Sequence, residues 1–160
     1  MNEDLTPAQD LAAGLENHRP TILLVDDNEQ NLELLLAYLE DLPCEVQTAC
    51  DGVQALEKMT RLNPDLVVLD IMMPRMSGYQ VCEKIKANPG LRDTPVVMVT
   101  ALNEVGDVER AVDAGADDFL TKPVNRLELV TRVTSLLRVR DLKRQLDKAV
   151  EQVRNLRGQQ

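Results

Sequence analysis

The sequence predicts an α/β fold with a doubly wound, five-stranded parallel sheet and an extended C-terminal helix. Short runs rich in Val, Ile and Leu alternate five times with segments whose apolar residues recur at helical spacing. Continuous apolar runs are typical of strands buried on both faces. Repeated strand–helix units give parallel sheets with right-handed crossovers. We therefore expect helices on both faces of one sheet.

The first two strand–helix repeats lie between Thr21 and the stop at Asn63-Pro64. Residues 21–26 form a continuous apolar run that ends in aspartate, and residues 45–50 alternate loosely, as an outer strand does. Asn28 is a suitable N-cap residue for the first helix, because its side chain can accept hydrogen bonds from the free backbone N–H groups of the first turn. The two helices are indicated by residues at helical spacing: Leu32, Leu35, Leu36 and Leu39, then Ala55, Leu56 and Met59.

The last three repeats follow in the same order. Each strand is short, apolar and bounded by turn residues, and Gly115 suits the end of a helix. The strands are expected at residues 65–70, 95–100 and 117–120, and the helices at 79–86, at 105–114 and from about 125 onward.

Length and composition limit the class of protein. The 160 residues carry a net charge of −9, which argues against a general nucleic-acid binder. Cys44, Cys50 and Cys82 have no metal-like spacing, and we interpret them as reduced thiols of a cytoplasmic protein. No window approaches the ~18 apolar residues of a membrane span. The N-terminus also lacks the apolar core of a secretory signal.

The chain divides into three parts. Residues 1–19 are expected to form a flexible or weakly helical leader, to which we assign no function. Residues 20–137 hold all the expected strands and have the length of one domain. Residues 138–160, here called the extension, continue the last helix. The segment from Leu136 onward has seven Lys or Arg against three acids, so its charge is opposite to that of the whole chain.

Polar residues that could form a functional site lie at the ends of four of the expected strands. Asp26 and Asp27 follow the first strand, Asp70 ends the third, Thr100 ends the fourth and Lys122 follows the fifth. The carboxyl ends of parallel strands lie at one edge of a sheet, where such folds bind ligands. Taken singly, each residue has a structural alternative: helix N-cap, turn former, strand end or solvated loop charge.

The joint placement of these residues favours a functional site. Chance would scatter them between the two edges of the sheet. Three carboxylates at one edge would repel one another unless a cation neutralised them. Oxygen ligands of this kind suit Mg²⁺. We therefore expect a divalent cation, a carboxylate and an ammonium group that together hold an anion.

Five motifs occur in unbroken order between about Pro20 and Leu137. They are Val25-Asp26-Asp27, Asp70-Ile71-Met72-Met73-Pro74 with Gly78, Thr100-Ala101, Gly115-Ala116-Asp117-Asp118-Phe119 and Thr121-Lys122-Pro123. Together they resemble the receiver domain of bacterial two-component response regulators. The resemblance is specific because all five spaced motifs must agree. It implies the flavodoxin-like strand order 2-1-3-4-5 and identifies residues 20–137 as the receiver domain.

The resemblance implies a role for each residue of the site. Asp70 would be the phosphoacceptor, which takes a phosphoryl group from a histidine kinase or a phosphotransfer protein. Asp27, Asp70, the backbone carbonyl of Met72 and, often through water, Asp26 would bind Mg²⁺. Lys122 would hold the phosphoryl oxygens from the side opposite the cation. The chain would thus be a phosphoacceptor and not an enzyme with turnover.

The resemblance also implies a switch and an interface. Thr100 would donate its hydroxyl to the phosphoryl group, and Phe119 would move into the space that Thr100 leaves. The switched surface would be the receiver's fourth helix, fifth strand and fifth helix. Asp118, Glu128 and Arg132 match charged positions of a family dimer through this face.

Two smaller features follow from the same resemblance. The peptide bond between Lys122 and Pro123 would be cis, aiming the lysine inward. Met72 and Leu102 are apolar residues beside the site, where they would screen the phosphoryl group from water. We therefore expect a long-lived phosphorylated state.

The extension carries an apolar heptad pattern, here called the apolar stripe: Val139, Leu142, Leu146, Ala149, Val153 and Leu156. Such a pattern predicts a coiled coil, and a solvated amphipathic helix is the alternative. In a parallel homodimer, Arg138 would lie near Lys143 of the second copy and repel it. Val150 widens the stripe, so a helical bundle and pairing with an acidic helix of another protein remain alternatives to the homodimer. Basic residues without interleaved aromatics argue against nucleic acid.

Three interpretations of the whole protein remain. The chain is a stand-alone receiver that signals by protein contact, or it is the N-terminal part of a regulator whose helix drives a cyclase, phosphodiesterase or kinase module. The third is an Asp-nucleophile phosphohydrolase. That class needs a second acid two residues after the nucleophile, where this chain has Met72, and the chain has no Gly-rich phosphate loop. The receiver interpretations are therefore favoured.

Overall fold

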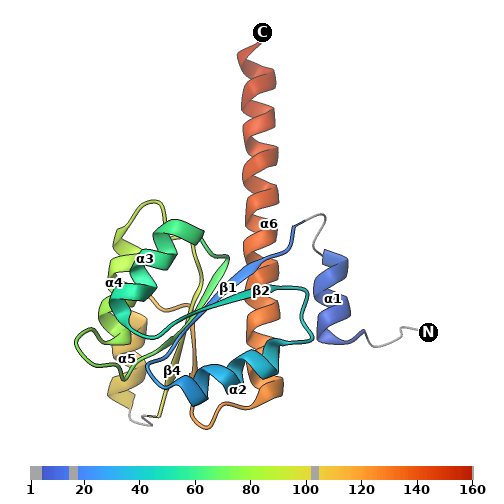
Figure 1. Cartoon of the computed structure of the whole chain (residues 1–160). Helices are drawn as coiled ribbons and strands as arrows, with labels where there is room; N and C mark the ends of the chain where they lie inside the picture. The colour runs from blue at the N-terminus through green and yellow to red at the C-terminus, as the bar shows by residue number, and fades with distance from the viewer. Residues whose placement is uncertain (1–4, 15–17, 102–104, 160) are drawn as a thin grey trace.

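The computed structural model describes residues 5–14, 18–101 and 105–159, which form a parallel sheet covered by helices (Figure 1). The sheet has five strands in the order β2-β1-β3-β4-β5, and every pairing is parallel, as predicted. The strands are β1 (Thr21–Val25), β2 (Glu45–Ala49), β3 (Leu66–Asp70), β4 (Val96–Thr100) and β5 (Asp118–Thr121). The helices are α1 (Pro7–Gly14), α2 (Glu29–Leu39), α3 (Gly52–Leu62), α4 (Gly78–Ala87), α5 (Val105–Asp113) and α6 (Arg126–Gly158).

Apolar side chains fill both faces of the sheet. Alternate residues of the central strands point to opposite faces, so that Leu23 and Val67 pack with α3, α4 and α5, while Leu24 and Val68 pack with α2 and α6. Both sets are buried. This explains why the sequence of these strands is apolar without alternation, as expected for a parallel sheet between two helical layers.

Local signals set the helix boundaries near the site. Asn28 caps α2, and its side chain accepts hydrogen bonds from the backbone N–H groups of Gln30 and Asn31, as predicted. Asp51 caps α3 in the same way through Gln54. These caps begin each helix within a few residues of the preceding strand, so the strand ends lie close to the helix N-termini.

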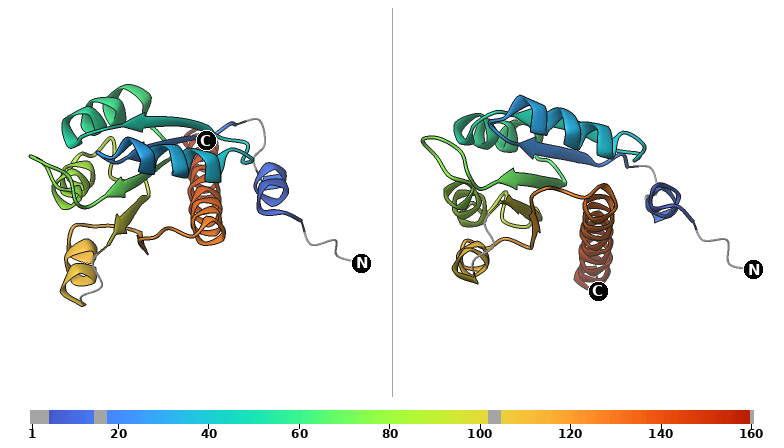
Figure 2. Two further views of the ribbon diagram at one scale, coloured as in Figure 1. Left: turned by 60° about the horizontal axis from the view of Figure 1, so that its bottom comes forward. Right: turned by 90° about the horizontal axis from the view of Figure 1, so that it is seen from below.

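The segment before β1, expected to be a flexible or weakly helical leader, contains a helix. Residues 7–14 form α1, which lies beside α6 (Figures 1 and 2). Leu11 is fully buried in the apolar cluster shared with α2 and α6, and Ala8 is partly buried. A single buried leucine gives no helical periodicity, so the sequence pattern alone could not predict this packing.

Helix α6 continues past the expected domain boundary at residue 137 without a break. It is a single helix of 33 residues, and its C-terminal part extends well beyond the sheet (Figure 1). Leu129, Val133 and Leu137 are buried against the sheet, whereas most apolar residues after them are exposed. Among the described residues, no helix is long and apolar enough to cross a membrane.

Candidate phosphoryl-transfer site

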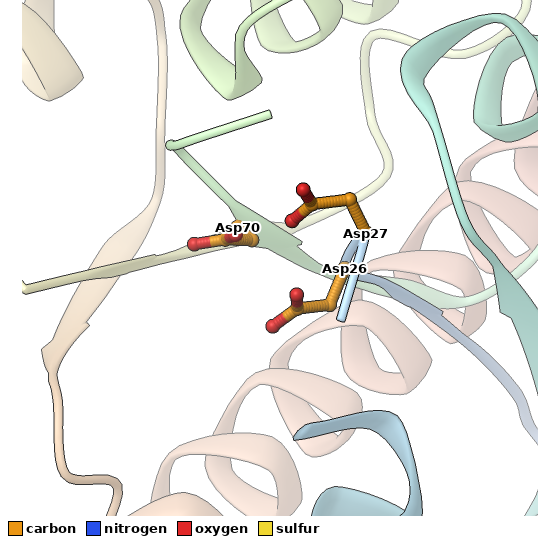
Figure 3. A group of neighbouring side chains, drawn as sticks. All are labelled: Asp26, Asp27 and Asp70. Carbon is orange, nitrogen blue, oxygen red and sulfur yellow. The ribbon is translucent and has the colours of Figure 1, made fainter. Parts of the chain in front are cut away.

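Three carboxylates gather at the carboxyl edge of the sheet, as the strand-end pattern predicted. Asp26 and Asp27 directly follow β1, and Asp70 is the last residue of the neighbouring strand β3 (Figure 3). A carboxylate oxygen from each lies within 4.8 Å of the others. Asp26 and Asp70 are buried and Asp27 is exposed. We call these three residues the acidic cluster.

Lys122 places one positive charge beside this acidic cluster. Its ammonium nitrogen lies 3.2 Å from Oδ1 of Asp70 and 3.8 Å from Oδ2 of Asp26. The peptide bond between Lys122 and Pro123 is cis, as predicted. The backbone N–H of Lys122 donates to the carbonyl of Thr100 at 2.7 Å, which ties the lysine to the end of β4.

Burial and a neighbouring negative charge both disfavour the charged form of Asp70. Burial raises the pKa of Asp70 above its usual value, and the nearby charge of Asp26 raises it further. Lys122 and a backbone hydrogen bond from Met72 act in the opposite direction without cancelling the rise. A bound cation would stabilise the charged carboxylates of this site. Oxygen ligands of this kind favour Mg²⁺.

Replacing Asp70 by asparagine is expected to stabilise the protein in the absence of divalent cations. An acid whose pKa is raised by folding makes stability fall as the pH rises through that pKa, and the penalty is complete above it. At pH 7 the variant should therefore have a higher free energy of unfolding than the parent. Urea denaturation in EDTA measures this. The gain should vanish below the ordinary pKa of 3.8, and a variant less stable than the parent at pH 7 would contradict the charge argument.

The other predicted site residues lie at different distances from the acidic cluster. Thr100 ends β4 and is buried, on the strand next to Asp70. Phe119 in β5 is partly buried and packs against the apolar cluster on the α3–α4–α5 face. The side chain of Met72 is largely exposed. Leu102 lies outside the described residues.

Two of the three charged residues predicted for a dimer interface pair with each other within the chain. Arg132 pairs with Asp118 at 3.0 Å, while Glu128 is exposed in the first turn of α6. Arg110 of α5 lies over the ring of Tyr79, 4.3 Å from its centroid. Asp118 and Arg132 thus connect β5 with α6, on the α5–β5–α6 face that is predicted to be the switched surface.

Two open hollows border the acidic cluster, and no pattern in the sequence predicts either of them. One is about 400 Å³ and lies between α2 and the loop after β5, beside Asp26 and Lys122. The other is about 450 Å³ and lies beside Asp27, Met72 and Arg110. The acidic cluster can therefore be reached from solvent through these two hollows.

Comparison with known proteins agrees with this arrangement. The family model described as response regulator receiver domain matches residues 22–134. The response regulator PleD of Caulobacter vibrioides is 49% identical over 117 residues, which cover 73% of this chain and 26% of PleD. The DNA-binding dual master transcriptional regulator RpaA of Synechocystis is 39% identical over 122 residues, covering 76% of this chain and 51% of RpaA.

A solved structure has the same fold. The signal receiver domain of a putative LuxO repressor protein from Vibrio parahaemolyticus superposes with a TM-score of 0.76 at 32% identity, covering 81% of this chain and 98% of that one. The doubly wound sheet and its strand-end carboxylates thus define a receiver-type domain. The chain belongs to the response regulator receiver domain family of bacterial two-component systems. It spans only about a quarter to a half of the length of these two relatives.

Proposed function

We propose that Asp70 accepts a phosphoryl group from a phosphohistidine of a histidine kinase or a phosphotransfer protein. A carboxylate oxygen of Asp70 attacks the phosphorus, the phosphorus–nitrogen bond breaks, and the imidazole leaves with a proton to give an aspartyl phosphate. The observation that supports this most directly is the acidic cluster with Lys122 at 3.2 Å from Asp70. Phosphoryl transfer needs a nucleophile, charge neutralisation and alignment, and these residues supply all three.

The acidic cluster also fits Mg²⁺ as the cofactor. Asp26, Asp27, Asp70 and the backbone carbonyl of Met72 would hold the ion. When bound, it would neutralise the charge on the phosphoryl oxygens and on the carboxylates. Lys122 would bind the same oxygens from the other side, and the hydroxyl of Thr100 would donate to one of them.

The aspartyl phosphate would act as a switch on the α5–β5–α6 face. The phosphoryl group adds about −1.5 to −2 charges and three acceptor oxygens, and it would draw Thr100 toward it. Phe119 is only partly buried, and we propose that its ring would move inward when Thr100 moves. Its inward movement would change the face that carries Asp118, Glu128 and Arg132. We place this signalling in the cytoplasm, where buried free thiols such as Cys44 and Cys82 stay reduced.

Labelling with a small phosphate donor tests the phosphoacceptor proposal. The purified chain is incubated with an acyl phosphate or phosphoramidate, with Mg²⁺ or with EDTA, and intact mass is followed. We expect one phosphoryl group per chain, dependent on Mg²⁺ and released by hydroxylamine, as an acyl phosphate is. Continuous release of phosphate from a phosphomonoester without a covalent product would instead support a phosphohydrolase.

The apolar stripe of the extension favours a second role in dimerisation. Val139, Leu142, Leu146, Val153 and Leu156 are each 50–67% exposed. The predicted repulsion between Arg138 and Lys143 of a second copy is reduced, because Lys143 pairs with Asp93 of its own chain at 3.1 Å. We therefore favour a parallel homodimer through the extension, which in a longer regulator would carry the signal to an output module.

Replacing Leu146 by glutamate is expected to weaken this dimer about 100-fold. Each copy loses the burial of one leucine, worth about 1.5 kcal/mol, and gains a charge in the apolar seam. Sedimentation equilibrium over a range of concentrations measures the change. Asn155→Glu, on an exposed position outside the stripe, should leave the association unchanged. A parent chain that is monomeric at all concentrations would refute the dimer but not the phosphoacceptor proposal.

A further inference from the structure

A second charged cluster lies at the edge of the sheet opposite the acidic cluster. Its centre is the carboxylate of Asp65, which directly precedes β3 and is buried. The backbone N–H of Thr21, the first residue of β1, donates to Oδ2 of Asp65 at 2.8 Å. The ring of His18 lies 3.3 Å from the same oxygen. Asp65 thus connects the starts of β1 and β3 with the segment before them.

Two arginines of the extension complete this arrangement. Nη1 of Arg144 lies 2.5 Å from Oδ1 of Asp65, and Nε of Arg140 lies 3.7 Å from the same oxygen. Nη1 of Arg140 also donates to the backbone carbonyl of Asp93 at 2.7 Å, and Lys143 pairs with the carboxylate of Asp93. We call His18, Thr21, Asp65, Arg140 and Arg144 the Asp65 cluster.

The centre of the Asp65 cluster is buried, while the side chains of His18 and Arg144 at its rim are 51% and 39% exposed. The side chains of Asp65 and Arg140 are only 6% and 11% exposed. Burial alone would raise the pKa of Asp65, but the hydrogen bond from Thr21 and the charge of Arg144 outweigh it and hold this pKa below its usual value. The carboxylate is therefore charged at neutral pH. A buried charge of this kind depends on its partners far more than an exposed one does.

The arginines extend the face of α6 that packs on the sheet. Buried residues on this face recur every three or four positions, at Leu129, Val133 and Leu137, and the same spacing leads to Arg140 and Arg144. The apolar stripe has a different phase, and its residues are exposed. The contacts with Asp65 therefore keep the stripe turned away from the sheet.

We propose that Asp65 is a positioning residue that fixes the direction of the extension relative to the sheet by binding Arg140 and Arg144. The part of α6 that is held in a fixed position on the sheet then ends near Arg144 and not at Leu137. The extension is attached to the starts of β1 and β3, the two strands whose other ends carry the acidic cluster. Three of the seven basic residues after Leu136 form ion pairs with Asp65 or Asp93. These three residues therefore have a structural role within the chain. The proposal does not depend on phosphorylation.

Distance measurement between two spin labels on the full chain tests this proposal. Cys50 is an exposed thiol, whereas Cys44 and Cys82 are buried and burial raises the pKa of each to about 11, so a label attaches selectively at Cys50. The second label is placed by Asn155→Cys in the extension. Dilution with unlabelled chain removes distances between copies. The parent should give one narrow distance distribution.

Two independent changes should broaden that distribution. Asp65→Asn keeps an oxygen for the Thr21 N–H but removes the charge, and the double variant Arg140→Gln with Arg144→Gln removes both partners from the helix side. We expect both to broaden the distribution. We also expect about tenfold faster hydrogen exchange at the amides of residues 138–145.

Arg126→Gln provides the control, because it breaks an exposed pair with Asp41 at the other end of the same helix. It should leave the distances and the exchange rates unchanged. Unchanged distances and exchange in both test variants would overturn the proposal. Equal broadening in the Arg126 control would overturn it as well, because the effect would then not be specific to Asp65. Near-parental circular dichroism of the arginine variant ensures that the comparison concerns a folded chain.

Discussion

Replacing Asp70 by asparagine is expected to abolish covalent phosphorylation of the chain, with an initial rate lowered by at least about 1,000-fold. The amide oxygen is a poor nucleophile, and the change also removes one of the three carboxylates that lie within 4.8 Å of one another. Intact mass spectrometry with a small acyl phosphate donor and saturating Mg²⁺ measures the rate. The stability gain expected for the same variant would show that the loss is chemical and not due to unfolding.

Asp41→Asn is the matched control for this loss. Asp41 is also an aspartate, but its side chain is exposed and pairs with Arg126 away from the acidic cluster. Its removal should leave the labelling rate within about twofold of the parent. Undiminished labelling of the Asp70 variant would place the nucleophile elsewhere and refute the proposed function.

Variants of the neighbouring residues separate cation binding from catalysis. Asp27→Asn should raise the Mg²⁺ concentration needed for half-maximal labelling by about 10–100-fold, because an exposed ligand is lost while the nucleophile remains. Lys122→Gln should lower the maximal rate by about 100–1,000-fold, because it removes a charge that stabilises the transferring group. Its Mg²⁺ dependence should change little. Opposite outcomes would exchange the roles assigned to these two residues.

The sequence predicted the sheet and the acidic cluster because both depend on short-range patterns. An apolar run predicts a buried strand, and the residue after it must then lie at the carboxyl edge. Asp26, Asp27, Asp70 and Lys122 are therefore brought together by topology alone. The order of the strands and the cis bond before Pro123 followed from the resemblance to the receiver family, and the structure confirms both.

The contacts that the sequence did not predict are pairings between distant residues. The sequence indicates Asp65 only as the first residue of an expected strand, and its partner Arg144 lies 79 positions later. The basic residues of the extension suggested an external partner, whereas Arg140, Lys143 and Arg144 bind the body of the same chain. Periodicity identifies the face of a helix but does not identify the side chain that it will meet.

Gly78 shows how closely the packing around Asp70 is determined. It is the first residue of α4, and its backbone N–H donates to the carbonyl of Ile71 at 2.9 Å. A Cβ at this position would lie 2.3 Å from the carbonyl oxygen of Asp70 and 2.8 Å from the Cα of Ile71. Both atoms belong to the backbone, so neither can move aside by changing a rotamer. Only glycine allows α4 to begin against the end of β3.

Gly78→Ala is therefore expected to destabilise the protein by about 3 kcal/mol or more, at the upper end of overpacking substitutions. Urea denaturation measures this loss. The backbone of Asp70 must also shift, so the labelling rate of the folded variant should fall even in mild conditions. A displacement of about 1 Å in a reacting group can slow a reaction by about 100-fold.

Gly106→Ala supplies the comparison that isolates this steric effect. Gly106 lies in α5, and a Cβ there meets nothing within 4 Å. Alanine favours helix over glycine by up to about 1 kcal/mol, so this variant should be as stable as the parent or more so, with parental labelling. If both alanine variants were equally stable, the ends of β3 and α4 would have room to separate. The placement of Asp70 would then depend on the pairing of β3 with β4 and not on the close approach of α4.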